Sequence, residues 1–441
     1  MLNIRAPRSR TWVRAPLVVF GVLAAGCGGG GDDTADGLFP LWTATSVRVV
    51  DLDGNGLPDV VTTAVLSPSM GVFEGHVKVR LQTSAGVFAA PQDHRTGLQA
   101  WTTQAADIDG DGRPDLVVGE PAKVWDNLVS PGGVWLLRQD GAQPGHFLPP
   151  TRLLSGPNVY DLDVADLTGD GVVDIALSDA RTGANRVVIL PQDPLSRGTF
   201  LAPRDLYMPG PVTRVMARDL NADGQADLTT AFTSATRTDY SYDTTLGLSL
   251  QKAGSFPAAQ WLTTFAYGPA AHMAVTDFNG DGRPDVAAYF ERFDERAVPT
   301  IRLLPQNASG GWASAIDTAL PVTTVQGRDG QAVADLNGDG RPDFAFVGTY
   351  PDGTTADGVS IIRSDLNLLM QSADGRFVPN TVYALPMQAT RVGAGDVNGD
   401  GRIDLVVYGS ISQFSGNLDQ AQLLLQSGAT AGQFLAPVTL P

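Results

Sequence analysis

A nine-residue acidic motif recurs seven times along the 441-residue chain, and this repetition constrains the fold more than any other feature. The first aspartates of successive copies are separated by 56, 59, 53, 58, 58 and 61 residues. Self-similarity at so even a spacing is the sequence signature of a repeat architecture. The copies are DLDGNGLPD (51–59), DIDGDGRPD (107–115), DLTGDGVVD (166–174), DLNADGQAD (219–227), DFNGDGRPD (277–285), DLNGDGRPD (335–343) and DVNGDGRID (396–404).

A second motif keeps the same period. In every repeat a glutamine ends an apolar run, and a Gly-x-aromatic sequence follows it. The glutamines are Gln82, Gln139, Gln192, Gln251, Gln306, Gln371 and Gln426. The glycine and aromatic pairs are Gly86/Phe88, Gly145/Phe147, Gly198/Phe200, Gly254/Phe256, Gly310/Trp312, Gly375/Phe377 and Gly432/Phe434.

Each repeat is predicted to contain four short strands. In the sixth repeat, one strand runs into Asp335, and further strands follow at 344–347, at 366–370 and from Phe377. Helical patterning is scarce, and short β-branched runs separated by Gly, Asp and Pro favour an all-β fold. Seven such repeats predict a seven-bladed β-propeller of four-stranded antiparallel blades over 38–441. A WD-type propeller is excluded because its period is about 40–45 residues.

The acidic motif has the spacing of a calcium-binding loop. Calcium takes about six to eight oxygen ligands, which side chains at positions 1, 3, 5 and 9 and the carbonyl at position 7 can supply. We therefore expect up to seven Ca²⁺ ions. The predicted ligands are Asp51, Asp53, Asn55, Leu57, Asp59, Asp107, Asp109, Asp111, Arg113, Asp115, Asp166, Thr168, Asp170, Val172, Asp174, Asp219, Asn221, Asp223, Gln225, Asp227, Asp277, Asn279, Asp281, Arg283, Asp285, Asp335, Asn337, Asp339, Arg341, Asp343, Asp396, Asn398, Asp400, Arg402 and Asp404.

The motif has two other interpretations. An EF-hand requires a glutamate at position 12 of the loop, where this chain has Thr62, Val118, Leu177, Thr230, Ala288, Phe346 and Val407, so that interpretation fails. A tight acidic turn without metal would crowd like charges together. Thr168 at position 3 of the third loop and Ala222 at position 4 of the fourth weaken those copies, and the sequence leaves open whether they hold calcium.

Together, the acidic loops and the Gly-x-aromatic stretches resemble the FG-GAP/VCBS repeat. That repeat builds the seven-bladed propeller of integrin α-subunits and of many bacterial surface proteins. The resemblance implies that each acidic loop joins the first and second strands of a blade on one face of the ring. A shortened Gly-x-Phe stretch at 37–39 departs from the pattern and leaves open how the ring closes.

The first 37 residues are predicted to lie outside the propeller. Four arginines precede a short apolar stretch at 16–25, which is typical of a signal peptide. Small residues directly before Cys27, the single cysteine, resemble the lipobox of bacterial lipoproteins. The resemblance implies a signal peptide over 1–26, a lipid on Cys27, a tether over 27–37 and a place in the cell envelope, at the outer membrane by the glycine that follows Cys27. An ordinary signal peptide with an incidental cysteine is the alternative.

Composition narrows the function further. A net charge of −17 argues against nucleic acid as a partner. No nucleophile or nucleotide-binding motif is present, so we expect a non-enzymatic module that binds protein or glycan, with a polysaccharide lyase or hydrolase as the alternative. Specificity is expected in the variable loops at 66–75, 120–132, 233–245 and 410–419. Candidate ligand-binding aromatic residues are Trp101, Trp125, Tyr160, Tyr240 and Tyr242.

Overall fold

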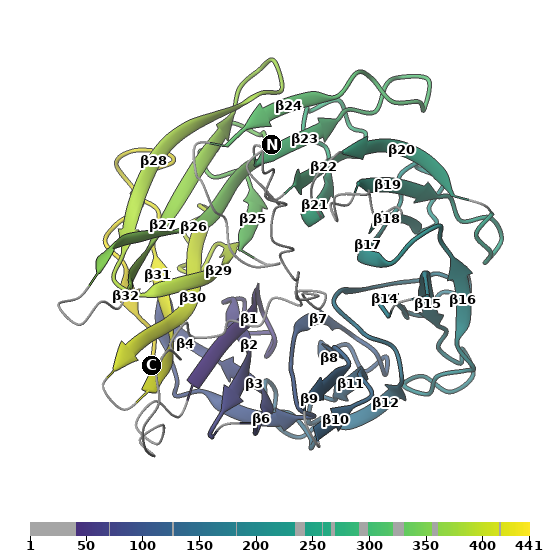
Figure 1. The fold of residues 1–441 in the computed structure, drawn as a ribbon, viewed down its shortest axis with the longest axis horizontal. Coiled ribbons are helices and arrows are strands. Elements are labelled where there is room, and N and C mark those ends of the chain that lie inside the picture. The colour runs from purple at the N-terminus through teal and green to yellow at the C-terminus, as the bar shows by residue number, and fades with distance from the viewer. Residues whose placement is uncertain are drawn as a thin grey trace, which may run out of the picture. The chain divides into compact units, whose positions relative to one another are not determined.

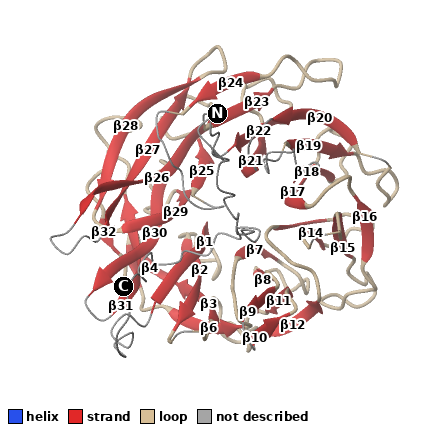
Figure 2. Cartoon of the chain, viewed as in Figure 1, coloured by secondary structure: helices blue, strands red, loops and turns tan. Residues whose placement is uncertain are grey.

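The computed structural model describes residues 41–69, 71–125, 128–181, 183–233, 243–257, 259–265, 270–290, 299–320, 330–354, 360–413 and 416–441. The predicted signal peptide and tether, Cys27, Tyr240 and Tyr242 lie outside these residues. The described chain forms seven four-stranded antiparallel sheets arranged in a ring (Figure 1). Every regular element among the described residues is a strand (Figure 2). The predicted seven-bladed β-propeller is therefore confirmed.

The strands of each blade follow one another in the chain. Blade 1 contains β1 (Leu41–Val50), β2 (Asp59–Ser67), β3 (Glu74–Arg80) and β6 (Gln92–Thr96). Blade 2 contains β7 (Thr102–Ala106), β8 (Asp115–Glu120), β11 (Gly133–Leu137) and β12 (Thr151–Ser155). Blade 3 contains β13 (Leu162–Ala165), β14 (Asp174–Asp179), β15 (Arg186–Leu190) and β16 (Arg204–Tyr207). Blade 4 contains β17 (Val212–Arg218), β18 (Asp227–Thr233), β19 (Thr244–Ser249) and β20 (Gln260–Phe265).

The remaining blades repeat this order. Blade 5 contains β21 (Ala270–Thr276), β22 (Asp285–Phe290), β23 (Thr300–Leu304) and β24 (Ile316–Ala319). Blade 6 contains β25 (Gln331–Ala334), β26 (Asp343–Thr354), β27 (Ser360–Gln371) and β28 (Phe377–Leu385). Blade 7 contains β29 (Gln388–Gly395), β30 (Asp404–Gln413), β31 (Gly416–Leu424) and β32 (Val438–Thr439). Two small ribbons are added by β4 (Gln82–Ser84) with β5 (Val87–Phe88), and by β9 (Lys123–Trp125) with β10 (Leu128–Ser130).

Burial along the strands follows their place in a blade. All residues of β8, β14 and β22 are buried, because a second strand is covered by neighbouring blades on both faces. Such strands appear in the sequence as short continuous apolar runs. In contrast, β24 alternates between half-buried and exposed residues, as expected for an outermost strand with one face in water.

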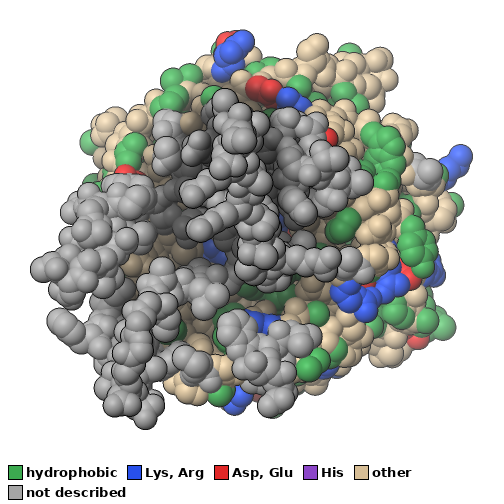
Figure 3. Space-filling model, in the orientation of Figure 1, with side chains coloured by type: hydrophobic (Ala, Val, Ile, Leu, Met, Phe, Trp, Pro, Cys, Tyr) green, Lys and Arg blue, Asp and Glu red, His purple; other side chains and the backbone are tan. Residues whose placement is uncertain are grey.

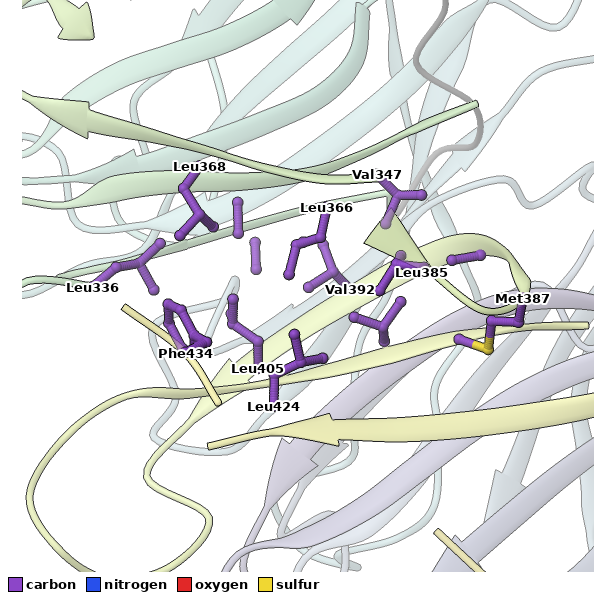
Figure 4. Close-up of a cluster of buried hydrophobic side chains, with 14 residues drawn as sticks. Leu336, Val347, Leu366, Leu368, Leu385, Met387, Val392, Leu405, Leu424 and Phe434 are labelled. Carbon is purple, nitrogen blue, oxygen red and sulfur yellow. The ribbon is translucent and has the colours of Figure 1, made fainter. Parts of the chain in front are cut away.

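The hydrophobic core consists of apolar clusters between adjacent blades, one at each of the seven interfaces. Figure 4 shows the cluster between blades 6 and 7, where Leu366 and Leu368 of β27 meet Leu405 of β30 and Leu424 of β31. Full burial of one such side chain contributes about 1.5–3 kcal/mol. The apolar clusters therefore lie between blades, and a blade alone could not bury its hydrophobic faces.

Blades 1 and 7 close the ring by packing and not by exchange of a strand. Every blade is built from its own consecutive strands, and the fourth strand of blade 7 is β32. Across this seam the Lys78 ammonium lies 2.8 Å from both carboxylate oxygens of Asp419. Arg391 Nε donates to the carbonyl oxygen of Thr45 at 2.5 Å. Residues at 37–39, which the sequence left as a possible closing element, lie outside the described residues.

Candidate metal centres in the acidic loops

Each acidic loop joins the first and second strands of a blade. The loop at 51–58 follows β1, and Asp59 begins β2, and the same order holds in the other blades. All seven loops therefore lie at the same end of their blades, as the family resemblance implied. We call this end of the propeller the lower face and the opposite end the upper face.

The aspartate at position 1 organises the loop around its own carboxylate. In all seven copies one of its oxygens accepts a hydrogen bond from the N–H of the position-6 glycine, at 2.7 to 3.0 Å. These glycines have φ between 82° and 87°, a left-handed conformation that other residues adopt only at a cost. The glycine at position 6 is thus required by the turn itself.

The aspartate at position 9 is buried and holds two strands to the loop. One oxygen accepts the N–H of position 2 at 2.8 to 3.1 Å. The other accepts the N–H of the repeated glutamine at 2.7 Å in every blade. Burial raises the pKa of Asp59, Asp115, Asp285 and Asp343 to about 6, although these hydrogen bonds lower it in part. Burial also raises the pKa of Asp174, Asp227 and Asp404.

The residue at position 5 accepts the N–H of position 7 at 2.7 to 3.1 Å in every loop. Where position 7 is arginine, its guanidinium also pairs with the position-5 carboxylate, at distances from 2.5 Å for Arg341 to 3.4 Å for Arg113. The sequence predicted a backbone role for these arginines and missed this ion pair. It partly neutralises a predicted calcium ligand in the second, fifth, sixth and seventh loops.

The acidic loop of one blade is the docking surface for the next blade. The Gln139 side-chain amide donates to the carbonyl oxygen of Leu52 at 2.9 Å, and the Gln306 and Gln426 amides donate to Leu220 and Leu336 at 2.7 and 2.6 Å. A Cβ added to Gly254 would lie 2.2 Å from the carbonyl oxygen of Thr168 in the preceding loop. The two repeated motifs are therefore the two halves of one contact between blades.

The aromatic residue of the second motif completes this contact. In each core cluster it packs with the apolar residue at position 2 of the preceding blade's loop. Phe434 with Leu336 is drawn in Figure 4. Phe88 of blade 1 packs in the same way with Val397 of blade 7, so the contact also spans the seam that closes the ring. Order in the loops is thus coupled to order between the blades.

The loops bring carboxylates close enough to share one cation. Oxygens of Asp51, Asp53 and Asp59 lie within 4.8 Å of one another, and so do oxygens of Asp107, Asp109 and Asp111. In the other loops position 3 is Asn or Thr, so an amide or a hydroxyl takes the place of one carboxylate. Oxygen-rich donor sets of this kind suit a hard divalent cation such as calcium.

The third and fourth loops keep the common shape despite their departures in sequence. Gly171 and Gly224 donate to Asp166 and Asp219 at 2.8 Å, as their equivalents do. Ala222 occupies the left-handed conformation at φ 60°, where five of the other loops have a glycine with φ between 72° and 75° and Gly110 has 79°. The fourth loop thus keeps the turn geometry of the other six loops, at the cost of backbone strain at Ala222.

The aromatic residues predicted to bind ligand are only partly brought together. The rings of Trp101 and Tyr160 form an edge-to-face pair across blades 2 and 3, with centroids 5.8 Å apart. Trp125 lies on β9, in the hairpin that β9 and β10 add to the upper face of blade 2. The upper-face residues that line a concave surface are instead charged and aliphatic, and are described below. Because they come from unequal positions of two repeats, no sequence period could reveal them.

Polar and apolar side chains of the inner strands meet around the central channel. A small cavity of about 80 Å³ is bordered there by Arg48, Gln104, Asp163, Arg214 and His272, among others. The inner strands use such side chains to hold the neighbouring blade, since Asp163 accepts the Ala217 N–H at 2.9 Å. The face shown in Figure 3 presents mainly neutral side chains, with scattered Lys and Arg outside the grey atoms.

The fold and the seven equivalent loops define a seven-bladed β-propeller with an acidic turn in each blade. The FG-GAP-like repeat matches residues 219–288 and 335–407, and the FG-GAP repeat matches residues 100–137. The chain therefore carries FG-GAP repeats within a seven-bladed β-propeller. No helix of the described residues combines the length and apolar character that a membrane crossing requires.

Several known proteins are similar to parts of this chain. Phosphatidylinositol-glycan-specific phospholipase D of Bos taurus is 35% identical over 100 residues, which are 20% of this chain and 11% of that protein. A T-cell immunomodulatory protein homolog of Plasmodium yoelii yoelii is 22% identical over 275 residues, 58% of this chain and 38% of that protein. The chain thus spans well under half of these relatives. A rhamnogalacturonan lyase PL11 of Bacillus licheniformis is 16% identical, with TM-score 0.33 over 88% of this chain and 73% of that chain.

Proposed function

We propose that this propeller is a calcium-stabilised, non-enzymatic binding and adhesion module of the cell envelope. The observation that carries the calcium role is the equivalence of the seven loops, which each gather several oxygen donors at a contact between blades. Bound calcium would neutralise the crowded carboxylates and so strengthen those contacts. Calcium is then a structural ion, and ligand recognition falls to the upper face.

The test is thermal unfolding of the purified protein with calcium and with excess chelator, together with a count of bound metal. A ligand that binds only the native state raises stability by mass action. We expect five to seven Ca²⁺ per chain, roughly one for each oxygen-rich loop, and a large fall in melting temperature on chelation. Unchanged melting and no bound metal would rule out the calcium role.

Attachment to the envelope is proposed from the sequence around Cys27. A lipid on this cysteine would hold the propeller at a membrane through the 27–37 tether. The test is a Cys27→Ser variant expressed in a bacterial host. We expect the parent protein to partition into detergent and the variant to remain in the aqueous phase. Equal partitioning of the two proteins would contradict the lipid anchor.

A carbohydrate-active enzyme on the same scaffold is the competing function. It is tested by incubating the protein with a panel of acidic and neutral polysaccharides and following new reducing ends and unsaturated products. Saturable binding without turnover is the expected result. Turnover abolished by substitution of one upper-face acidic residue would replace the binding role with an enzymatic one.

A further inference from the structure

The upper face carries an open, shallow pocket at the seam between blades 1 and 2. Its volume is about 420 Å³, within the range of about 300 to 1,000 Å³ that is typical of small-molecule sites. Its walls come from the end of β6, the 97–101 connection between the two blades, the end of β8, the β9–β10 hairpin and β12. It lies at the opposite end of the blades from the acidic loops.

One buried glutamate holds these walls together. Glu120 is fully buried, and its Oε1 accepts the Leu98 N–H at 2.9 Å and the Ser130 hydroxyl at 2.7 Å. Its Oε2 accepts the Trp135 indole N–H at 2.9 Å and a hydrogen bond from the Arg152 guanidinium. Each carboxylate oxygen of Glu120 thus accepts two hydrogen bonds. Glu120 therefore holds the walls of the pocket in place and is poorly suited to proton transfer.

Arg152 is presented to the pocket in a fixed orientation. Its guanidinium lies over the Trp135 ring, 4.6 Å from the centroid. Nη1 also donates to the carbonyl oxygen of Gly132 at 3.0 Å, and the side chain is 27% exposed. A stacked guanidinium held by several acceptors loses little freedom when it binds an anion.

A second guanidinium and an apolar flank complete the pocket. Arg95 is 61% exposed, and its Nη2 lies 3.0 Å from the Glu74 carboxylate. Leu98, Val129 and Pro131 form the apolar part of the wall, and Val129 is 65% exposed. Guanidinium groups recognise carboxylates through paired hydrogen bonds, while the aliphatic surface suits the C–H face of a ring.

We infer that this pocket binds an acidic saccharide, a sugar ring that carries a carboxylate. The inference rests on the proposed binding role and names the ligand class for it. The carboxylate lies between Arg95 and Arg152, and the ring packs on Leu98 and Val129. An open pocket of this size has room for one or two rings against its wall, whereas an extended peptide would need a longer groove or a free strand edge.

The inference is tested by calorimetric titration of the purified protein with glucuronate, glucose and a polyglutamate peptide. We expect saturable binding of glucuronate, and binding of glucose at least tenfold weaker. Arg95→Gln should weaken glucuronate binding at least threefold and Arg152→Lys at least fivefold, because lysine keeps the charge but not the stacked fork. Both variants should melt within a few degrees of the parent, since Arg95 is exposed and Lys can still pair with Glu120.

Arg376→Gln is the matched control, because Arg376 is similarly exposed (67%), also pairs with an acidic residue and lies in blade 6. It should leave glucuronate binding unchanged. The inference would be overturned if the parent protein did not bind glucuronate, or if it bound only polyglutamate. It would also be overturned if the Arg95 and Arg152 variants bound glucuronate as tightly as the parent protein. Its failure is separate from failure of the calcium role, because melting with and without chelator reports on the lower-face loops only.

Discussion

At the scale of single residues, the aspartate at position 9 differs from the other acidic residues of its loop. It is fully buried, and its two oxygens accept one backbone N–H from position 2 of the loop and one from the repeated glutamine that follows the third strand. In the fifth loop, the half-buried Asp277 and the exposed Asn279 and Asp281 form their hydrogen bonds within the loop. Position 9 should therefore support the fold with or without metal, whereas position 3 should matter only when metal is bound.

The fifth loop allows this difference to be measured. In Asp285→Asn an amide N–H₂ would face a backbone N–H, leaving a buried donor unsatisfied at a cost of about 1–3 kcal/mol. We expect a lower melting temperature both in calcium and in chelator. Asn279→Ala, which removes an exposed acceptor, should lower the melting temperature in calcium only. Equal behaviour of the two variants in chelator would contradict the structural role of position 9.

Ala222 offers a second prediction at this scale. A left-handed alanine costs about 1–2 kcal/mol relative to a right-handed one, and the extra freedom of glycine in the unfolded chain offsets part of that. Ala222→Gly should therefore stabilise the protein by roughly 1 kcal/mol. Gly338→Ala in the sixth loop is the reverse control, since its added Cβ would meet no atom within 4 Å at φ 75°. It should destabilise by a similar amount, as followed by thermal unfolding.

At the scale of elements, the hairpin after each third strand docks on the acidic loop of the preceding blade. Gly254 and Gly310 hold the same place in this hairpin, with φ of 72° and 78°. An added Cβ would strike the Thr168 carbonyl at Gly254 but would meet open space at Gly310. The pair thus separates the docking contact from backbone strain.

We expect Gly310→Ala to destabilise by about 1 kcal/mol through its backbone conformation alone. Gly254→Ala should cost roughly 1–3 kcal/mol more, because the hairpin must move away from the third loop. Melting curves of both variants, with and without calcium, measure the difference. Equal losses would mean that the hairpin does not depend on close contact with the neighbouring loop.

These contacts also show how far the sequence could predict the structure. The repeated loop, glutamine and Gly-x-aromatic stretch predicted the blade number and the four strands of each blade, because every copy carries the same local information. The contact of Gln139 with Leu52 was not predicted, since a period does not say which blade a side chain faces. The variable loop at 120–132, where the sequence placed specificity, contributes to the Glu120 pocket, but the pocket's walls from blade 1 and from Arg152 were not predicted, because a period does not say which blades meet there.

At the scale of the whole molecule, the ring is held by seven similar interfaces, and the seam between blades 1 and 7 adds polar contacts to its apolar cluster. Lys78 lies 2.8 Å from both carboxylate oxygens of Asp419, and Oδ2 of Asp419 also accepts the Tyr408 hydroxyl at 2.7 Å. Burial is the main cause that raises the pKa of Tyr408 well above its usual range, and the nearby Asp419 raises it further. The hydroxyl therefore stays protonated and acts as a donor. Lys78 and Asp419 are 341 residues apart in sequence, so their contact across the seam could not be predicted from the repeats.

The charge of the lower face connects calcium, pH and stability. Four of the position-9 carboxyls have a pKa of about 6 in the folded protein against 3.8 in an exposed chain. The folded state then binds more protons than the unfolded state between these values. Without metal, these groups make stability fall as pH rises from about 4 to about 6, and the cost stays in place above that.

Calcium reverses this dependence, because it binds the deprotonated carboxylates and removes their repulsion. We expect the difference in melting temperature between calcium and chelator to be largest above pH 7 and to shrink as pH falls through about 6. Thermal unfolding at pH 5 to 8 measures it. Asp179 is a buried carboxyl outside the loops and does not affect this pH dependence. Burial would raise its pKa, but hydrogen bonds from Arg181, Asn158 and Arg186 hold the pKa below 3.8. Its contribution is therefore lost only at lower pH. A calcium effect that is constant from pH 5 to 8 would show that the buried position-9 carboxylates take no part in binding the metal.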